Sequence, residues 1–164
     1  MATPLPGRTT AAHDGEIVVF LIGMRINNYR AVRSWWPVLL AMPRMLRELT
    51  RNPASGLLGF RGALTGPRSL EVVQYWESRE KLLAYASAPE QEHRPAWAAF
   101  NRRARQAGGQ VGVFHETYVV PADSFETIYY GMPAYGLAAA TGSLPVGRRG
   151  ESAADRLDRA RPAA

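Results

Sequence analysis

The stretch Val111-Gly-Val-Phe-His-Glu-Thr-Tyr-Val-Val120 lies between Gly108-Gly109 and Pro121 and is rich in β-branched and aromatic residues. This composition, bounded by turn-forming residues, predicts a β-strand. Successive side chains of a strand point to opposite faces of a sheet, so His115 and Glu116 are expected on opposite faces. Neither face of the stretch is simply polar, which indicates a sheet that is covered on both sides.

Further segments of strand and helix character surround this stretch. The predicted strands are residues 17–26, 57–65, 69–76 and 111–120, and the predicted helices are residues 31–49, 80–88 and 95–106. The two short helices share one connection, so the order is βαββαβ, a ferredoxin-like α+β fold with an antiparallel sheet. Pro43 lacks the N–H that a helix interior needs, which predicts a kink or a second helix beginning near Met42. A short strand is also expected at residues 126–130.

The apolar character of both strand faces bears on assembly. A ferredoxin-like sheet normally carries its helices on one face, so the other face needs a second layer. Another copy of the same chain, packed sheet against sheet, supplies that layer most economically. The sequence therefore predicts a homodimer.

The ends of the chain differ in composition from its middle. At 164 residues the chain is long enough to bury one core. Residues 1–15 contain Pro, Gly, Thr and Ala without a period and are expected to form a flexible N-terminal arm. Residues 16–135 form the predicted domain, and residues 136–164, which have few large apolar side chains, are expected to be disordered.

Composition also bears on partners and location. The net charge is +6, but Lys81 is the only lysine and the arginines are spread along the chain, so a nucleic-acid partner is not expected. The absence of cysteine excludes disulfides and thiolate chemistry. No apolar segment reaches the roughly 20 residues that span a bilayer, and the polar N-terminus has no signal-peptide core. A cytoplasmic protein without a membrane partner is the expectation. Three scattered histidines predict no metal site.

Several strings of residues resemble a known family. They are VFLIGMRIN (residues 19–27), WPVLLAMPRMLREL (36–49), LLGF (57–60), VQYW (73–76), PAWAAFNRR (95–103) and VGVFHETY (111–118). With these strings, residues 16–135 resemble a family of small uncharacterised bacterial proteins. That family is grouped with the antibiotic-biosynthesis monooxygenase-like proteins of the dimeric α+β barrel superfamily, and includes a domain similar to the monooxygenase of the fumagillin pathway.

The resemblance implies a fold and a range of chemistries. In the superfamily two ferredoxin-like monomers close their sheets into a dimeric α/β barrel, and the pocket lies between the helices and the sheet of one monomer. Cofactor-free members oxidise electron-rich aromatic substrates with O₂. Other relatives bind haem, among them haem-degrading enzymes, chlorite dismutase-like proteins and aldoxime dehydratases. Haem is therefore an open alternative to a cofactor-free reaction, because a shared fold does not choose between them.

The central stretch holds the first candidates for catalysis. His115 is a candidate general base or axial haem ligand, and its alternative is a hydrogen-bonded core or interface histidine. Glu116 and Tyr118 share a face and could hydrogen-bond a substrate. The alternative for Glu116 is an ion pair with Arg25 or Arg61.

Other candidates lie at the ends of elements. His93, between the two short helices, is a candidate haem ligand, with a solvated loop residue as the alternative. Arg25 and Asn27 end the first strand and could bind a carboxylate, a haem propionate or an oxyanion. The alternative for Arg25 is an ion pair with a nearby glutamate. Tyr75 and Trp97 are candidate walls of a pocket for an aromatic substrate.

These residues support one expected function and two alternatives. The expected function is a monooxygenase-like enzyme that acts with O₂ on a small hydrophobic or aromatic molecule. One alternative is a haem enzyme related to aldoxime dehydratases or haem-degrading proteins. The other is a non-catalytic dimer that binds a hydrophobic ligand.

Overall fold

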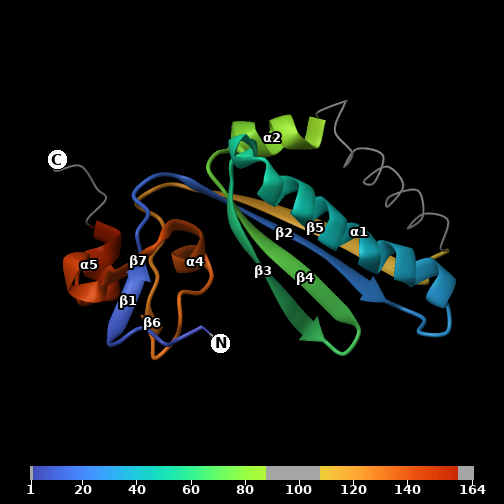
Figure 1. Ribbon diagram of the computed structural model, residues 1–164, viewed down its shortest axis with the longest axis horizontal. Coiled ribbons are helices and arrows are strands. Elements are labelled where there is room, and N and C mark those ends of the chain that lie inside the picture. The colour runs from blue at the N-terminus through green and yellow to red at the C-terminus, as the bar shows by residue number, and fades with distance from the viewer. Residues whose placement is uncertain (1, 88–107, 159–164) are drawn as a thin grey trace.

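The computed structural model describes residues 2–87 and 108–158, and its centre is a four-stranded antiparallel sheet (Figure 1). The strand order is β3-β4-β2-β5, and we call this the main sheet. Its strands are β2 (Ile17–Ile26), β3 (Leu57–Gly66), β4 (Ser69–Trp76) and β5 (Val111–Val120). This arrangement confirms the predicted ferredoxin-like α+β fold. The helix predicted at residues 95–106 lies outside the described residues.

Two helices lie on one side of the main sheet (Figure 1). They are α1 (Val32–Arg51) and α2 (Arg79–Ser87), and the short helix η1 (Pro53–Ser55) follows α1. Apolar side chains at helical spacing on α1 pack against β2 and β4: Val38, Leu46 and Leu49. This burial holds α1 together as one helix through Pro37 and Pro43. Of the two outcomes expected near Met42, the second helix is therefore wrong, because packing of the buried stripe outweighs the missing hydrogen bond.

The register of the main sheet fixes which residues share a side. β2 lies between β4 and β5, with Ile22 opposite Val72 on one side and His115 on the other. Because strand side chains alternate, these three residues face the helices. Trp76 and Val18, which are also opposite each other, belong to this helix side and are fully buried.

The opposite side of the main sheet is largely open, and we call it the open side. It carries Val19, Leu21, Val73, Phe114 and Tyr118. Phe114 packs over Gly23, where a Cβ atom would lie 2.5 Å from the aromatic ring. Phe114 and Tyr118 are 37% and 51% exposed, so a single chain covers this face only in part.

A second sheet stands at one end of the main sheet, at the left of Figure 1. Its order is β6-β1-β7, formed by β1 (Arg8–Ala11), β6 (Tyr129–Tyr130) and β7 (Ser143–Pro145), and the helices α4 (Leu137–Thr141), η2 (Val146–Arg148) and α5 (Ala153–Asp158) accompany it. We call residues 8–14 and 121–158 the accessory lobe. Leu137 and Ala138 pack against Ile17 and cover that end of the open side.

The accessory lobe corrects two sequence predictions. The flexible arm expected at residues 1–15 contains β1, and the disorder expected at residues 136–164 gives way to regular structure as far as residue 158. The strand expected at residues 126–130 shortens to two residues. The physical reason is long-range pairing: Thr9 lies opposite both Tyr129 and Pro145. Short strands that form only with distant partners have no local signal.

Within the described residues no helix is both long enough and apolar enough to cross a membrane.

Candidate functional site

A cavity of about 240 Å³ lies between the helix side of the main sheet and the helices α1 and α2. We call it the helix-side cavity. Most of its wall is apolar, with Phe20 and Trp76 from the sheet and Leu82 from α2. Three polar side chains of the sheet reach it: His115, Thr117 and Gln74. An apolar hollow with a few polar groups is the usual form of a site for a small organic molecule.

His115 stands at the open rim of this cavity. It is an exposed residue of β5, the edge strand of the main sheet. Its ring lies next to that of Phe20, with the ring centroids 5.8 Å apart and the planes tilted by 35°. Thr117, two residues along the same strand and also exposed, lies opposite Phe20. The rim therefore carries an imidazole and a hydroxyl beside the apolar wall.

Gln74 lies on the floor of the cavity, on β4. It is 3% exposed and lies opposite Phe20 in the sheet. Trp76 Nε1 donates a hydrogen bond of 3.0 Å to Gln74 Oε1. One strand, β2, lies between β4 and β5, so Gln74 and Thr117 face the cavity from backbones two strand spacings, or about 10 Å, apart.

Tyr85 of α2 contributes a phenol to the cavity wall. Burial raises the pKa of Tyr85, and the carboxylate of Glu48 raises it further. The Tyr85 ring packs beside Trp76, with centroids 5.4 Å apart. Tyr85 therefore contributes to the cavity wall an aromatic ring with a protonated hydroxyl group.

Glu116 and Tyr118 form a pair on the open side, away from His115. The Tyr118 hydroxyl donates a hydrogen bond of 2.6 Å to Glu116 Oε2. This bond to a carboxylate raises the pKa of Tyr118. The three candidates from the central stretch thus divide between two faces, and the helix-side cavity receives only His115.

The structure places the three described substrate-binding candidates outside the cavity. Arg25 is exposed on the open side. Asn27 links the loop after β2 to the turn before β5: its Nδ2 donates a hydrogen bond of 2.8 Å to the backbone oxygen of Gly109. Tyr75 is also on the open side, where Arg61 Nε donates to its hydroxyl over 3.4 Å. Trp97 and the haem-ligand candidate His93 lie outside the described residues.

Sequence reasoning overlooked Gln74, Thr117 and Tyr85 as cavity residues. A signal for Gln74 was present: it is the one amide in the apolar run VVQYW, and alternation places it on the same face as Trp76. Tyr85 and Thr117 gave no comparable signal. They line the same cavity only because α2 packs near β5 in the folded chain.

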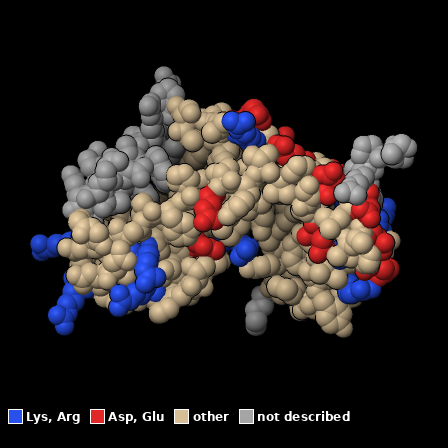
Figure 2. All heavy atoms as spheres, turned by 180° about the vertical axis from the view of Figure 1, so that it is seen from behind, with Lys and Arg blue, Asp and Glu red and all other residues tan. Residues whose placement is uncertain are grey.

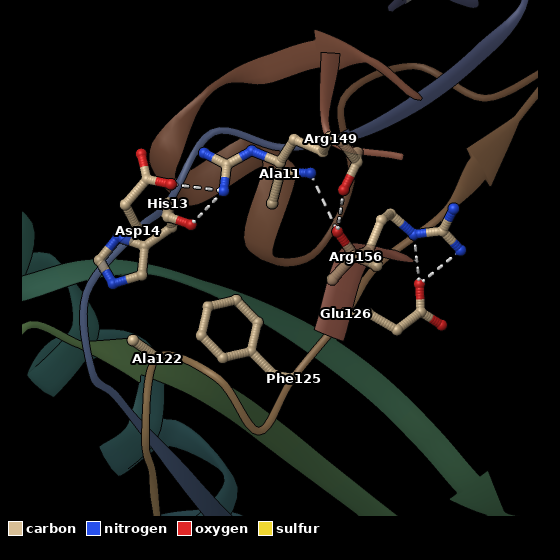
Figure 3. Close-up of a pocket in the computed structure, with 10 residues that line it drawn as sticks. Ala11, His13, Asp14, Ala122, Phe125, Glu126, Arg149 and Arg156 are labelled. Atoms are coloured by element: carbon tan, nitrogen blue, oxygen red, sulfur yellow. Dashed lines mark hydrogen bonds and ion pairs between the residues drawn. The ribbon is translucent and has the colours of Figure 1, made fainter. Parts of the chain in front are cut away.

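The accessory lobe contains a second cavity, of about 260 Å³ (Figure 3). The two arginines in its wall form ion pairs and hydrogen bonds with other residues of the lobe. Arg149 NH1 contacts Asp14 Oδ1 at 2.6 Å and donates to His13 O over 3.0 Å. Arg156 binds Glu126 Oε2 through Nε at 2.9 Å and through NH2 at 2.8 Å. Figure 2 shows charged side chains of both signs gathered over this lobe. These pairs fasten the C-terminal segment to the β1–β2 connection and to the chain after β5.

Two other kinds of ligand can be tested against the described residues. A volume of about 240 Å³ is below the roughly 300–1,000 Å³ typical of ligand pockets, which suits a small molecule better than a macrocycle. The described lining of the helix-side cavity includes an imidazole, and no Lys or Arg is among these described residues. In residues 2–87 and 108–158 no group of three or more His, Asp or Glu is placed to hold a metal ion.

Comparison with known proteins assigns the family. The sequence matches the monooxygenase af470-like family over residues 17–137. The chain therefore belongs to the monooxygenase af470-like family. A search of curated proteins found no match.

Two solved aldoxime dehydratase structures share the fold, and a third protein has a lower similarity. An aldoxime dehydratase (OxdRE) in complex with butyraldoxime is similar with a TM-score of 0.62 and 19% identity, covering 86% of this chain and 42% of that one. A second aldoxime dehydratase has a TM-score of 0.57 and 21% identity, covering 85% and 46%. SnoaB, a cofactor-independent oxygenase from Streptomyces nogalater, has a TM-score of 0.40 and 12% identity, covering 63% and 91%. The chain spans less than half the length of either aldoxime dehydratase.

Proposed function

We propose that this chain is a cofactor-independent monooxygenase that acts with O₂ on a small hydrophobic or aromatic molecule in the helix-side cavity. The observation that carries the proposal is an apolar cavity with one imidazole, His115, at its rim. Membership of a monooxygenase-like family supports it.

In the proposed reaction His115 is the general base. It takes a proton from an acidic C–H of the substrate, and a positioned base of this kind contributes about 10²–10⁴-fold to a rate. The aromatic walls of Phe20 and Trp76 favour a flat substrate that spreads the resulting carbanion over its rings. Glu116 and Tyr118 have no part in this step, since their side chains face the other side of the sheet.

The carbanion then reacts with O₂ without a cofactor. It transfers electrons to O₂, and a C–O bond forms to give a hydroperoxide anion that takes a proton. Loss of water from the hydroperoxide leaves a carbonyl at the former CH₂, so one oxygen atom enters the substrate and the other leaves as water. A largely apolar cavity limits the access of water to these intermediates.

We also propose that the enzyme is a homodimer that closes its open sides against each other. Phe114 and Tyr118 are exposed there in the single chain, next to Leu21 and Val19. Burying an apolar sheet face is favourable at about 25 cal/mol per Å². The dimer would place the Glu116–Tyr118 pair at the interface between the subunits.

Oxygen uptake tests the proposal. Purified protein is screened with acidic aromatic substrates in an oxygen electrode, with and without added haemin. We expect uptake without haemin, and a loss of at least about 100-fold in His115→Ala. Glu116→Gln is the matched control, since it alters the neighbouring residue on the opposite face, and it should keep uptake near the wild-type rate.

Three outcomes would contradict the proposal in different ways. Uptake that His115→Ala leaves unchanged would remove the imidazole from the mechanism. A stoichiometric Soret band and activity only with haemin would favour the haem enzyme. Saturable binding of aromatic ligands without any oxygen uptake would favour a non-catalytic ligand-binding dimer.

A further inference from the structure

We propose that Gln74 is the hydrogen-bond donor that binds the oxygen of the substrate, and that the substrate is therefore a molecule with a phenol or carbonyl oxygen conjugated to its reacting carbon. Trp76 is the positioning residue for this donor. The inference deepens the proposed function and rests on it for the identity of the reaction.

The orientation of the Gln74 amide follows from its neighbour. Trp76 Nε1 is a donor and has no acceptor capacity. It lies 3.0 Å from one terminal atom of Gln74, so that atom must be the carbonyl oxygen Oε1. The NH₂ group, Nε2, is consequently turned away from Trp76. Trp76 is fully buried, so its indole cannot swing aside and let the amide rotate.

The NH₂ group of Gln74 has no acceptor within the described part of the chain. Trp76 is the partner of its Oε1, and no hydrogen bond within residues 2–87 and 108–158 uses its Nε2. Gln74 is 97% buried, being 3% exposed, and it lines the helix-side cavity. Because Gln74 lines the cavity and its Oε1 is held by Trp76, its NH₂ group can serve as a point of attachment for an incoming oxygen.

The chemistry of the cavity selects an anionic or polarised oxygen. The rest of the described floor is hydrocarbon and indole, with Phe20, Ile22 and Trp76 around Gln74. A donor in surroundings of low polarity interacts strongly with developing negative charge. When His115 removes a proton, the charge of a carbanion conjugated to a carbonyl group moves onto the carbonyl oxygen, which becomes an enolate or phenolate oxygen. Gln74 then stabilises the product of the step that His115 begins.

The positions of the two side chains suit a flat molecule between them. Gln74 is on β4, and His115 is two strands away on β5. Neighbouring strands are about 4.8 Å apart, which separates the two backbones by roughly 10 Å across the sheet. That span is comparable with two or three fused rings lying along the floor, with the oxygen at Gln74 and the acidic carbon toward the rim.

Binding of 4-nitrophenol tests the assignment without turnover. Its phenol and phenolate forms differ in visible absorption, so the Kd for each form can be read from titrations at several pH values. We expect the wild type to prefer the phenolate. Gln74→Leu, which has no donor, should weaken phenolate binding about tenfold or more, because a hydrogen bond to a charged group is lost.

Two further variants separate donation from mere structural support. Gln74→Glu keeps the oxygen that accepts from Trp76 but has no NH₂ group, so where the new carboxyl is ionised it should reverse the preference in favour of the neutral phenol. Circular dichroism and Tm must show that this variant is folded, because a carboxylate at this buried position is costly. Trp76→Phe keeps an aromatic ring but frees the amide to rotate, and its phenolate preference should fall between those of the wild type and Gln74→Leu. The same Gln74 effects are expected in a His115→Ala background.

The outcomes distinguish this assignment from the proposed function. Equal phenolate binding by wild type, Gln74→Leu and Gln74→Glu would overturn it, as would the absence of saturable binding by the wild type. Phenolate binding that depends on Gln74, with no oxygen uptake on any acidic aromatic substrate, would uphold the donor and reject the oxygenase.

Discussion

His115 and Glu116 are consecutive residues of β5, and their side chains point to opposite faces of the main sheet. His115 lines the helix-side cavity, whereas Glu116 accepts a hydrogen bond from Tyr118 on the open side. The two-residue period of a strand imposes this separation. Changes at the two positions should therefore have separable effects, one on the cavity and one on the interface side.

The pair on the open side gives a prediction about titration. The carboxylate of Glu116 raises the pKa of Tyr118 by accepting its hydrogen bond. Glu116→Gln removes that charge, so the pKa of Tyr118 should fall toward its ordinary value. Ultraviolet titration of tyrosinate measures this, with Tyr118→Phe in both backgrounds to identify the residue. An unchanged titration curve would mean that the pair does not persist in solution.

A second prediction concerns assembly through the open side. Phe114→Asp places a charge on the exposed apolar part of this face, where a sheet-to-sheet contact would have to bury it at high cost. Light scattering should show a shift from dimer to monomer at micromolar concentration. Arg44→Glu is the control, because Arg44 is exposed on α1 at the other side of the sheet. A wild-type monomer, or an unaltered Phe114→Asp dimer, would argue against this interface.

The main sheet shows which parts of the fold the sequence predicts well. β2 and β5 have the boundaries that their β-branched and aromatic runs predict. The turn at Pro67 and Arg68 also lies where glycine and proline indicate it, between β3, which ends at Gly66, and β4. These elements were predictable because their signals are local, and because each strand is long enough for alternation to be visible.

The accessory lobe and the cavity were not predictable in the same way. β1 and β7 have four and three residues, too few to show a period, and each depends on a partner more than a hundred residues away. Gln74 differs, since its place on the helix side followed from alternation. Its free donor became visible only with the contact to Trp76. The alternation of side chains along a strand predicts which face of the sheet a residue occupies. The hydrogen-bonding role of that residue depends on contacts that only the folded structure shows.

A third prediction concerns the close contact between the accessory lobe and the main sheet. A Cβ atom at Gly59 of β3 would lie 2.7 Å from the Cβ of Ala140 in α4. Gly59→Val should therefore displace α4 and destabilise the fold by about 1–3 kcal/mol, roughly 3–10 °C in Tm for a chain of this size. Gly62→Val on the same strand is the matched control, because a Cβ there meets nothing within 4 Å. Equal Tm values for the two variants would contradict the contact.

The last prediction compares two ion pairs of the accessory lobe that differ in burial. The side chain of Arg156 is 5% exposed and that of Glu126 is 28% exposed, so Glu126→Ala leaves a buried guanidinium without its carboxylate. The backbone carbonyls of Gly150 and Glu151 still accept from Arg156 NH1, and they offset part of the loss. We expect a cost of about 2–3 kcal/mol.

The pair of Arg8 and Glu151 is the matched control, with side chains 47% and 66% exposed. Solvent screens such a pair, so Glu151→Ala should cost less than about 1 kcal/mol. Urea unfolding gives both values, and limited proteolysis should detect release of α5 in Glu126→Ala alone. If both variants lose the same stability, burial of Arg156 is not what fastens the C-terminal segment. A larger loss in Glu126→Ala means that the buried Arg156–Glu126 pair contributes more to holding the C-terminal segment than the exposed pair does. Its detachment can then be studied without changing the helix-side cavity.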